Sequence, residues 1–157
     1  MQVYLLGLIS LFCLACSPSS SNGNQTTLNT HQSNHKSPLH TMKISLTTQQ
    51  HTFTASLANN ATARDFYRAL PLTLKLSDYA QSEKIATNIP KLSIADAPKG
   101  YAGKQGDLTY YAPWGNLAIF YQDSYVGYAN GLVYLGKIDG DIGLLTDGEV
   151  LIDKLTD

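Results

Sequence analysis

The residues best suited to bind a ligand are aromatic and centre on one predicted turn. Trp114 stands at the tip of this turn, shortly after Tyr111. A Trp in this position either folds back as a cap over the core or stays available to a ligand. In the second case it would line a shallow aromatic cleft able to grip a peptide or a small planar ligand. The candidate ligand-binding residues are Arg64, Tyr79, Glu83, Tyr111, Trp114, Asn116 and Tyr121.

The charged residues near these aromatics have two interpretations each. Glu83 and Lys84 would be the polar members of such a cleft, or they form an exposed charge pair. Arg64 and Arg68 are the only arginines, and both fall in a predicted helix. The simpler interpretation makes them surface residues that pair with Asp65 or Asp78. We therefore expect no catalytic residue among these groups.

Metal and cofactor chemistry find little support in this chain. His31, His35 and His40 lie in a polar segment without fixed geometry, and His51 is the only later histidine. The run 139–141 matches a calcium loop at two positions only, so a turn explains it better. Phosphate loops and dinucleotide fingerprints are absent. No metal and no cofactor are expected.

Charge and cysteine content exclude further classes of function. The 157 residues include 11 basic and 12 acidic side chains, with no basic block. Nucleic acid is not an expected partner, because phosphate binding needs a concentrated positive field. Cys13 and Cys16 are the only cysteines. The rest of the chain therefore offers no thiol catalysis, disulfide exchange or cysteine metal site.

The N-terminus predicts a membrane anchor. Residues 3–15 are apolar but too short to span a bilayer, as in a signal peptide over residues 1–15. Leu14-Ala15-Cys16, followed by a Ser-rich tract, resembles a bacterial lipobox, which implies a lipid on Cys16 and a membrane partner. A polar, disordered tether would follow over 16–41. We expect a lipoprotein of the cell envelope, facing the periplasm or the exterior, with a domain over 42–157.

Alternating and helical patterns predict the elements that would position the candidate residues. Residues 43–47 and 51–57 alternate polar and apolar side chains and form an opening hairpin. The stripe of Ala63, Phe66, Tyr67 and Leu70 predicts a helix over 62–70. Thr62 and Asp65 resemble a capping box at its start, and Pro71 ends it.

The strongest strand signal is residues 106–121, which predict two strands joined by a tight turn. Pro113 suits the second turn position and Gly115 the fourth. The flanking Leu, Ile, Tyr and Phe indicate strands that are covered on both faces.

The remaining pattern completes a mainly β fold. We expect strands over 72–76, 132–138 and 149–153, a short strand within 85–92, loops over 97–106 and 122–131, and a turn over 142–145 capped by Asp141. About seven or eight strands and one short helix favour a closed or nearly closed β-barrel.

Four blocks of the domain resemble a bacterial cyclophilin-like family. The first is residues 62–66, and the second is residues 70–74 together with 78–79 and 83–85. The other two are residues 106–121 and 131–138, and the run Tyr-Tyr-Ala-Pro-Trp-Gly-Asn within 106–121 is the most specific. The resemblance covers about residues 43–151 and implies a closed barrel with a short helix. Some relatives are joined to a flavodoxin-like domain, which implies a flavodoxin-like partner.

True cyclophilins isomerise prolyl bonds with an arginine on a barrel strand, and this chain departs from that pattern. Its two arginines lie in the predicted helix, and the Phe-x-x-x-Met-x-Gln-Gly-Gly type of stretch is missing. No residue can be carried over from that active site. The favoured function is a non-catalytic binding or accessory module. The alternative is a prolyl isomerase of envelope proteins with a rearranged site.

Overall fold

Eight antiparallel strands close into a barrel in the computed structural model, which describes residues 41–155. The predicted signal peptide and Cys16 lie outside the described residues, as does the predicted tether up to residue 40. The barrel strands are β1 (Lys43–Thr47), β2 (Thr52–Leu57), β3 (Leu72–Tyr79), β4 (Glu83–Ala86), β6 (Asp107–Tyr111), β7 (Asn116–Phe120), β9 (Leu132–Asp139) and β10 (Gly148–Lys154). The predicted fold class is confirmed.

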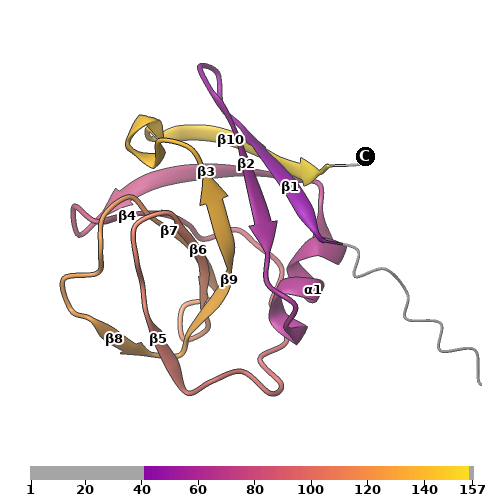
Figure 1. The fold of residues 1–157 in the computed structure, drawn as a ribbon, viewed down its shortest axis with the longest axis vertical. Coiled ribbons are helices and arrows are strands. Elements are labelled where there is room, and N and C mark those ends of the chain that lie inside the picture. The colour runs from indigo at the N-terminus through magenta and orange to yellow at the C-terminus, as the bar shows by residue number, and fades with distance from the viewer. Residues whose placement is uncertain (1–40, 156–157) are drawn as a thin grey trace, which may run out of the picture. The chain divides into compact units, whose positions relative to one another are not determined.

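The order of strands around the barrel is β1-β10-β3-β4-β7-β6-β9-β2, and β2 closes onto β1. Closure leaves no barrel edge unpaired. A separate two-stranded sheet pairs β5 (Gly100–Ala102) with β8 (Tyr128–Asn130). Figure 1 shows β5 and β8 at the lower left of the barrel and the helix α1 (Ala61–Ala69) at the lower right.

Side-chain alternation builds the core inside the barrel. Ile44 and Leu46 of β1 and Val150 and Ile152 of β10 are fully buried, while their neighbours along each strand are more exposed. β7 differs, because every residue along it is buried. Its outward residues Ala118 and Phe120 belong to a second apolar cluster, which includes residues of β5 and β8. The prediction of a strand covered on both faces is confirmed for β7.

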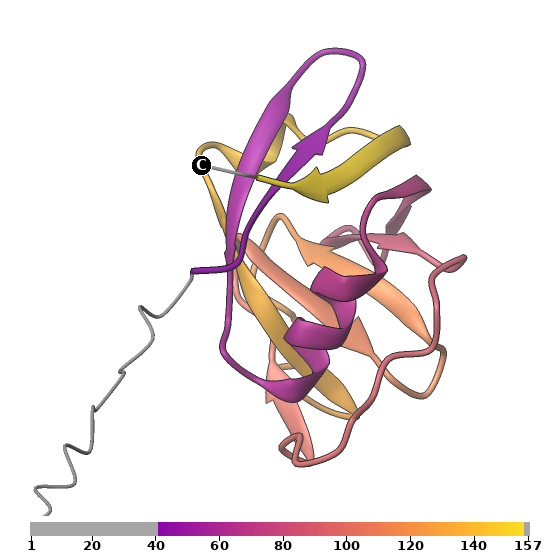
Figure 2. The same ribbon diagram turned by 90° about the vertical axis from the view of Figure 1, so that its right-hand side faces the viewer.

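The helix forms where its apolar stripe predicts, but a different residue caps it. Asn60 Oδ1 accepts a hydrogen bond from the Ala63 backbone N–H at 2.8 Å, so the predicted Thr62 capping box is wrong. The Asn60 amide also donates to the Tyr134 carbonyl at 2.8 Å, which ties the helix start to β9. Phe66 is fully buried. In Figure 2 α1, coloured magenta, lies in front of the barrel strands.

The turn between β6 and β7 begins one residue earlier than expected. The Tyr111 carbonyl accepts hydrogen bonds from the N–H groups of Trp114 at 3.3 Å and Gly115 at 2.9 Å. Pro113 is therefore the third turn residue and not the second. Gly115 follows the turn with a φ of +66°, in the left-handed region that favours glycine. This loop brings Tyr111 opposite Asn116 in the strand register.

Two segments predicted as loops contain short strands. β5 lies within 97–106, and β8 lies within 122–131. Each has three residues and pairs only with the other, so no local pattern marks them. The short strand expected within 85–92 is β4, which starts two residues earlier. Asp141 caps the predicted turn, the 3-10 helix η1 (Ile142–Leu144), by accepting from the Gly143 N–H.

Candidate functional site

A pocket of about 190 Å³ opens where three segments meet beside the barrel wall. The segments are the β3–β4 turn, the β6–β7 turn and the chain between β7 and β9. The pocket is lined by Tyr79, Ala80, Ser82, Glu83, Ile85, Tyr111, Trp114, Asn116, Phe120, Ser124, Tyr125, Val126, Ala129 and Leu132. Its volume suits a single side chain or a small head group and is too small for a dinucleotide.

Strand pairing explains why distant residues meet at this pocket. β4 lies between β3 and β7, with Glu83 opposite Tyr79 on one side and opposite Phe120 on the other. β6 is the next strand, and its end carries Tyr111 opposite Asn116. Five of the seven candidate residues named from the sequence therefore line one pocket. They are Tyr79, Glu83, Tyr111, Trp114 and Asn116.

Three aromatic rings form one wall of the pocket. The Trp114 ring meets Tyr79 edge-on, with centroids 5.5 Å apart and an interplanar angle of 90°. It meets Tyr111 in the same manner at 5.4 Å and 80°. Edge-to-face contacts of this kind fix the rings relative to one another. Trp114 is 58% exposed, which rules out a sealed core cap.

Glu83 places a poorly solvated carboxyl in the pocket. The side chain is half-buried, and burial raises the pKa of this carboxyl to about 7 from its ordinary value of 4.5. Among residues 41–155 it has no hydrogen bond and no ion pair. Within the described part of the chain, no other Asp, Glu, Lys, Arg or His side chain lines the pocket. At neutral pH this carboxyl is poised between its charged and neutral forms.

Asn116 adds a buried amide oxygen that has no hydrogen-bond partner in the described part of the chain. Its side chain is 1% exposed, and its amide donates to the Leu117 carbonyl at 3.0 Å. The Oδ1 atom accepts no hydrogen bond from any residue in the described part of the chain. A buried acceptor left unpaired costs free energy, which a donor from a ligand would recover.

Tyr121 and Lys84 lie outside the pocket, in a polar cluster on the adjoining surface. The Tyr121 hydroxyl donates to Asp78 at 2.6 Å, and Lys84 pairs with Asp78 at 3.0 Å and with Asp147 at 2.7 Å. The Tyr121 hydroxyl and the Lys84 ammonium together lower the pKa of the Asp78 carboxyl. Consecutive strand residues point to opposite faces, which separates Lys84 from Glu83. The expected grouping of Tyr121 and Lys84 with the cleft is therefore not what the structure shows.

Neither arginine lines the pocket. Both belong to α1, which lies on the right of the barrel in Figure 1, whereas β4 and β8 lie on the left. Arg64 donates to the Asn59 side chain at 2.7 Å. Arg68 pairs with Asp65 at 3.3 Å and is largely exposed. Pairing of Arg68 with Asp65 was predicted, and pairing with Asp78 does not occur.

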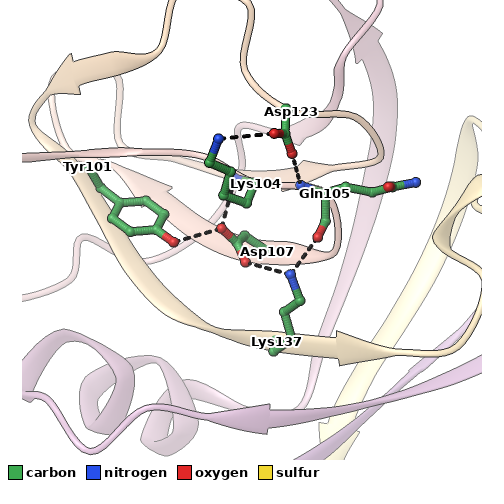
Figure 3. Close-up of polar contacts among 6 residues, drawn as sticks. All are labelled: Tyr101, Lys104, Gln105, Asp107, Asp123 and Lys137. Carbon is green, nitrogen blue, oxygen red and sulfur yellow. Dashed lines mark hydrogen bonds and ion pairs between the residues drawn. The ribbon is translucent and has the colours of Figure 1, made fainter.

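A second polar cluster surrounds Asp107 and serves as a structural tie (Figure 3). The Asp107 side chain is 3% exposed, and it accepts from the Tyr101 hydroxyl at 2.9 Å, from the Lys104 backbone N–H at 2.8 Å and from Lys137 at 3.1 Å. Burial, followed by the hydrogen bond to Asp107, raises the pKa of Tyr101 to about 12. Both carboxylate oxygens are thus satisfied within the protein. The cluster links β5, β6 and β9, and its central carboxylate is used within the protein.

Sequence reasoning missed the outer rim of the pocket. Tyr125 and Val126 line it and are 76% and 59% exposed. The sequence does contain a signal for this rim, because Tyr125 and Val126 are two adjacent large apolar residues within a polar loop. Such residues gain nothing from solvent exposure and often mark a contact surface.

Within residues 41–155 no three His, Cys, Asp or Glu side chains gather in a way that would hold a metal ion. The same part of the chain has no helix long and apolar enough to cross a membrane.

A family model described as the cyclophilin-like family matches residues 46–153. The chain belongs to the cyclophilin-like family. A solved structure with a similar fold is a hypothetical protein from Archaeoglobus fulgidus, with 15% identity and a TM-score of 0.54. The similarity covers 73% of this chain and 95% of the archaeal protein, and it concerns the fold alone. No curated protein matches this member of the cyclophilin-like family.

Proposed function

We propose that this cyclophilin-like domain is a non-catalytic binding module that holds one side chain of a peptide, or a small planar ligand, in the pocket beside Trp114. The observation that carries the proposal is the composition of the pocket wall. Tyr79, Trp114, Tyr125 and Val126 are all large apolar residues that remain at least 41% exposed. Exposed apolar side chains gathered around one hollow are typical of a binding site.

The absence of catalysis is proposed from the placement of the arginines. Prolyl isomerisation in cyclophilins depends on an arginine beside an apolar pocket, which stabilises charge in the transition state. Arg64 and Arg68 lie on α1 and line no part of this pocket. The pocket lining combines aromatic rings with one carboxyl, one amide and two serine hydroxyls, and contains no arginine that could stabilise charge on a prolyl bond.

The fluorescence of Trp114 provides a direct test, because it is the only Trp in the chain. The full-length protein is titrated with blocked pentapeptides that vary only at the central residue, and binding is followed by Trp emission. Indole serves as a small planar ligand, and its binding is followed by calorimetry because indole is itself fluorescent. We expect a saturable signal for at least one of these ligands. Replacing Tyr79 with Ala should weaken that binding about tenfold. The control Tyr128→Ala removes another exposed Tyr ring, which lies outside the pocket, and should have no effect.

No saturable signal with any peptide or with indole would overturn the proposal. Equal weakening by Tyr79→Ala and Tyr128→Ala would also overturn it, because the binding would then lie outside the pocket.

We further propose that the domain is displayed at the cell envelope as a lipoprotein, with a lipid on Cys16 and residues 1–15 removed. Support comes from the sequence Leu14-Ala15-Cys16 and the polar tract after it. Mass spectrometry of the membrane fraction should find an acylated N-terminal Cys16. An intact Met1, or a Cys16→Ala protein that stays in the membrane, would refute this.

A further inference from the structure

We propose that the ligand group held by the Trp114 pocket is an alkylammonium ion, from a lysine side chain or from a small free amine. The Glu83 carboxylate would be its counter-ion, and the rings of Tyr79, Tyr111 and Trp114 its aromatic wall. This inference rests on the proposed binding function and names the chemical class of the ligand.

The charge distribution of the pocket is the first support. Glu83 is the charged residue of the lining, and no cation among residues 41–155 pairs with it. Lys84 follows it in sequence but pairs with Asp78 and Asp147 on the other face of β4. A carboxylate that is removed from water and left without a partner costs free energy, which an incoming cation offsets. A neutral hydrogen-bond donor would offset less of this cost than a cation, and an anionic ligand would add to it.

The aromatic wall is the second, independent support. The faces of Trp and Tyr rings carry negative charge density and attract cations, most strongly where water is excluded. Three such rings line the same pocket as Glu83, and edge-to-face contacts at 5.5 Å and 5.4 Å join Trp114 to the two Tyr rings. A wall of aromatic side chains combined with one carboxylate suits an ammonium ion better than an uncharged aromatic ligand, because the carboxylate does not attract an uncharged ring.

The Asn116 Oδ1 atom is the third support. It is a buried acceptor without a partner in the described chain, on the same pocket as Glu83. A primary ammonium ion carries three N–H donors, so an amine that enters this end of the pocket supplies the donor that Oδ1 lacks. The volume of about 190 Å³ matches a short alkyl chain with such a head group better than an extended cofactor.

The ionisation of Glu83 makes this binding depend on pH. The other residues of the lining that carry an ionisable side chain are Tyr79 on β3, Tyr111 on β6 and Tyr125 after β7, and the residue opposite Glu83 on β7 is the apolar Phe120. Glu83 is the one carboxyl of the lining within the described residues. A change in affinity between about pH 5.5 and about pH 8.5 that is lost in Glu83→Gln therefore reports on Glu83. Because the charged carboxylate binds the cation, affinity should rise with pH, by about tenfold.

The experiment compares two pentapeptides, one with lysine and one with norleucine at the centre, which differ by the ammonium group. Binding to the full-length protein is followed by Trp114 fluorescence at several pH values. We expect the lysine peptide to bind about tenfold tighter than the norleucine peptide above neutral pH, with the gap shrinking in acid. Glu83→Gln should remove both the gap and its pH dependence. The control Glu149→Gln changes the only other glutamate and should preserve both.

Butylammonium distinguishes the two sources of the ligand group. Affinity equal to that of the lysine peptide supports a free amine, and weaker affinity supports a lysine within a protein. Equal binding of the lysine and norleucine peptides would overturn the inference and leave the proposed binding function standing. A gap that persists in Glu83→Gln would overturn it as well. Failure of every peptide, of indole and of butylammonium would overturn both proposals.

Discussion

Replacing Glu83 with glutamine should stabilise the protein above neutral pH and leave its stability in acid almost unchanged. The unfolded chain releases the Glu83 proton near its ordinary pKa of 4.5, whereas the folded protein holds it until about 7. Between these values folding takes up a proton, so the free energy of unfolding falls as pH rises. Above about pH 7 the folded protein carries a carboxylate in a poorly solvated place. Glutamine has nearly the same shape, cannot ionise and escapes this loss.

The magnitude follows from the two pKa values. At about 1.4 kcal/mol for each pKa unit, the difference between 4.5 and about 7 corresponds to an upper limit of about 3.4 kcal/mol. The Glu83 side chain is only half-buried, and solvent screens a charge that it can reach. We therefore expect Glu83→Gln to gain about 1–2 kcal/mol at about pH 8.5 and close to nothing at about pH 4.

Urea unfolding curves measured at intervals between these pH values test this prediction. The control is Glu149→Gln, which changes an exposed carboxyl on β10. Its stability relative to the wild type should stay level across the same range, within about 0.5 kcal/mol. The reasoning would be refuted if Glu83→Gln and the wild type were equally stable above neutral pH. It would also be refuted if the gain were already complete in acid.

Three further predictions concern the core, the polar tie and catalysis. Phe66→Ala should cost about 3–5 kcal/mol in urea unfolding, because the ring is fully buried; a loss below about 1 kcal/mol would place α1 off the core. Asp107→Ala should cost about 3 kcal/mol, because it removes a buried carboxylate that accepts three hydrogen bonds. The control Asp123→Ala removes an exposed carboxylate and should cost less than about 1 kcal/mol. Similar losses in the two variants would contradict the structural role of Asp107. In an assay of Xaa-Pro peptide isomerisation the full-length protein should not exceed the uncatalysed rate; acceleration that vanishes in the Arg64→Ala, Arg68→Ala double variant would show that the domain is catalytic.

Local sequence signals determined the main elements of the fold. The Pro113-Trp114-Gly115 turn between apolar runs marks the β6–β7 hairpin, and the stripe through Phe66 with Pro71 behind it marks α1. These signals suffice because turn dihedral angles and the helical period depend on residues only a few positions apart. The residue that caps α1 was not predicted correctly. Asn60 rather than Thr62 caps α1, because the Asn60 amide is also held by the Tyr134 carbonyl, a partner distant in sequence.

The candidate site was only partly accessible to the same reasoning. The sequence marked Trp114 and its neighbours as ligand candidates from their types and from the turn. Tyr79 and Glu83, which are also candidates, line the same pocket as Trp114 because β4 pairs between β3 and β7. Tyr121 does not line it, and its hydroxyl donates to Asp78 instead. Side chains alternate between strand faces, so a single step in register decides which residues share a pocket.

Tertiary structure alone decided the closing order of the barrel, the pairing of β5 with β8 and the chemistry of Glu83. Strands of three residues carry too few side chains for a recognisable period, so they form only where a partner strand is brought alongside. The sequence shows that position 83 is a glutamate just before the short strand predicted within 85–92. Its raised pKa comes from burial among segments up to about fifty residues away in the sequence, and the sequence alone contains no measure of that burial.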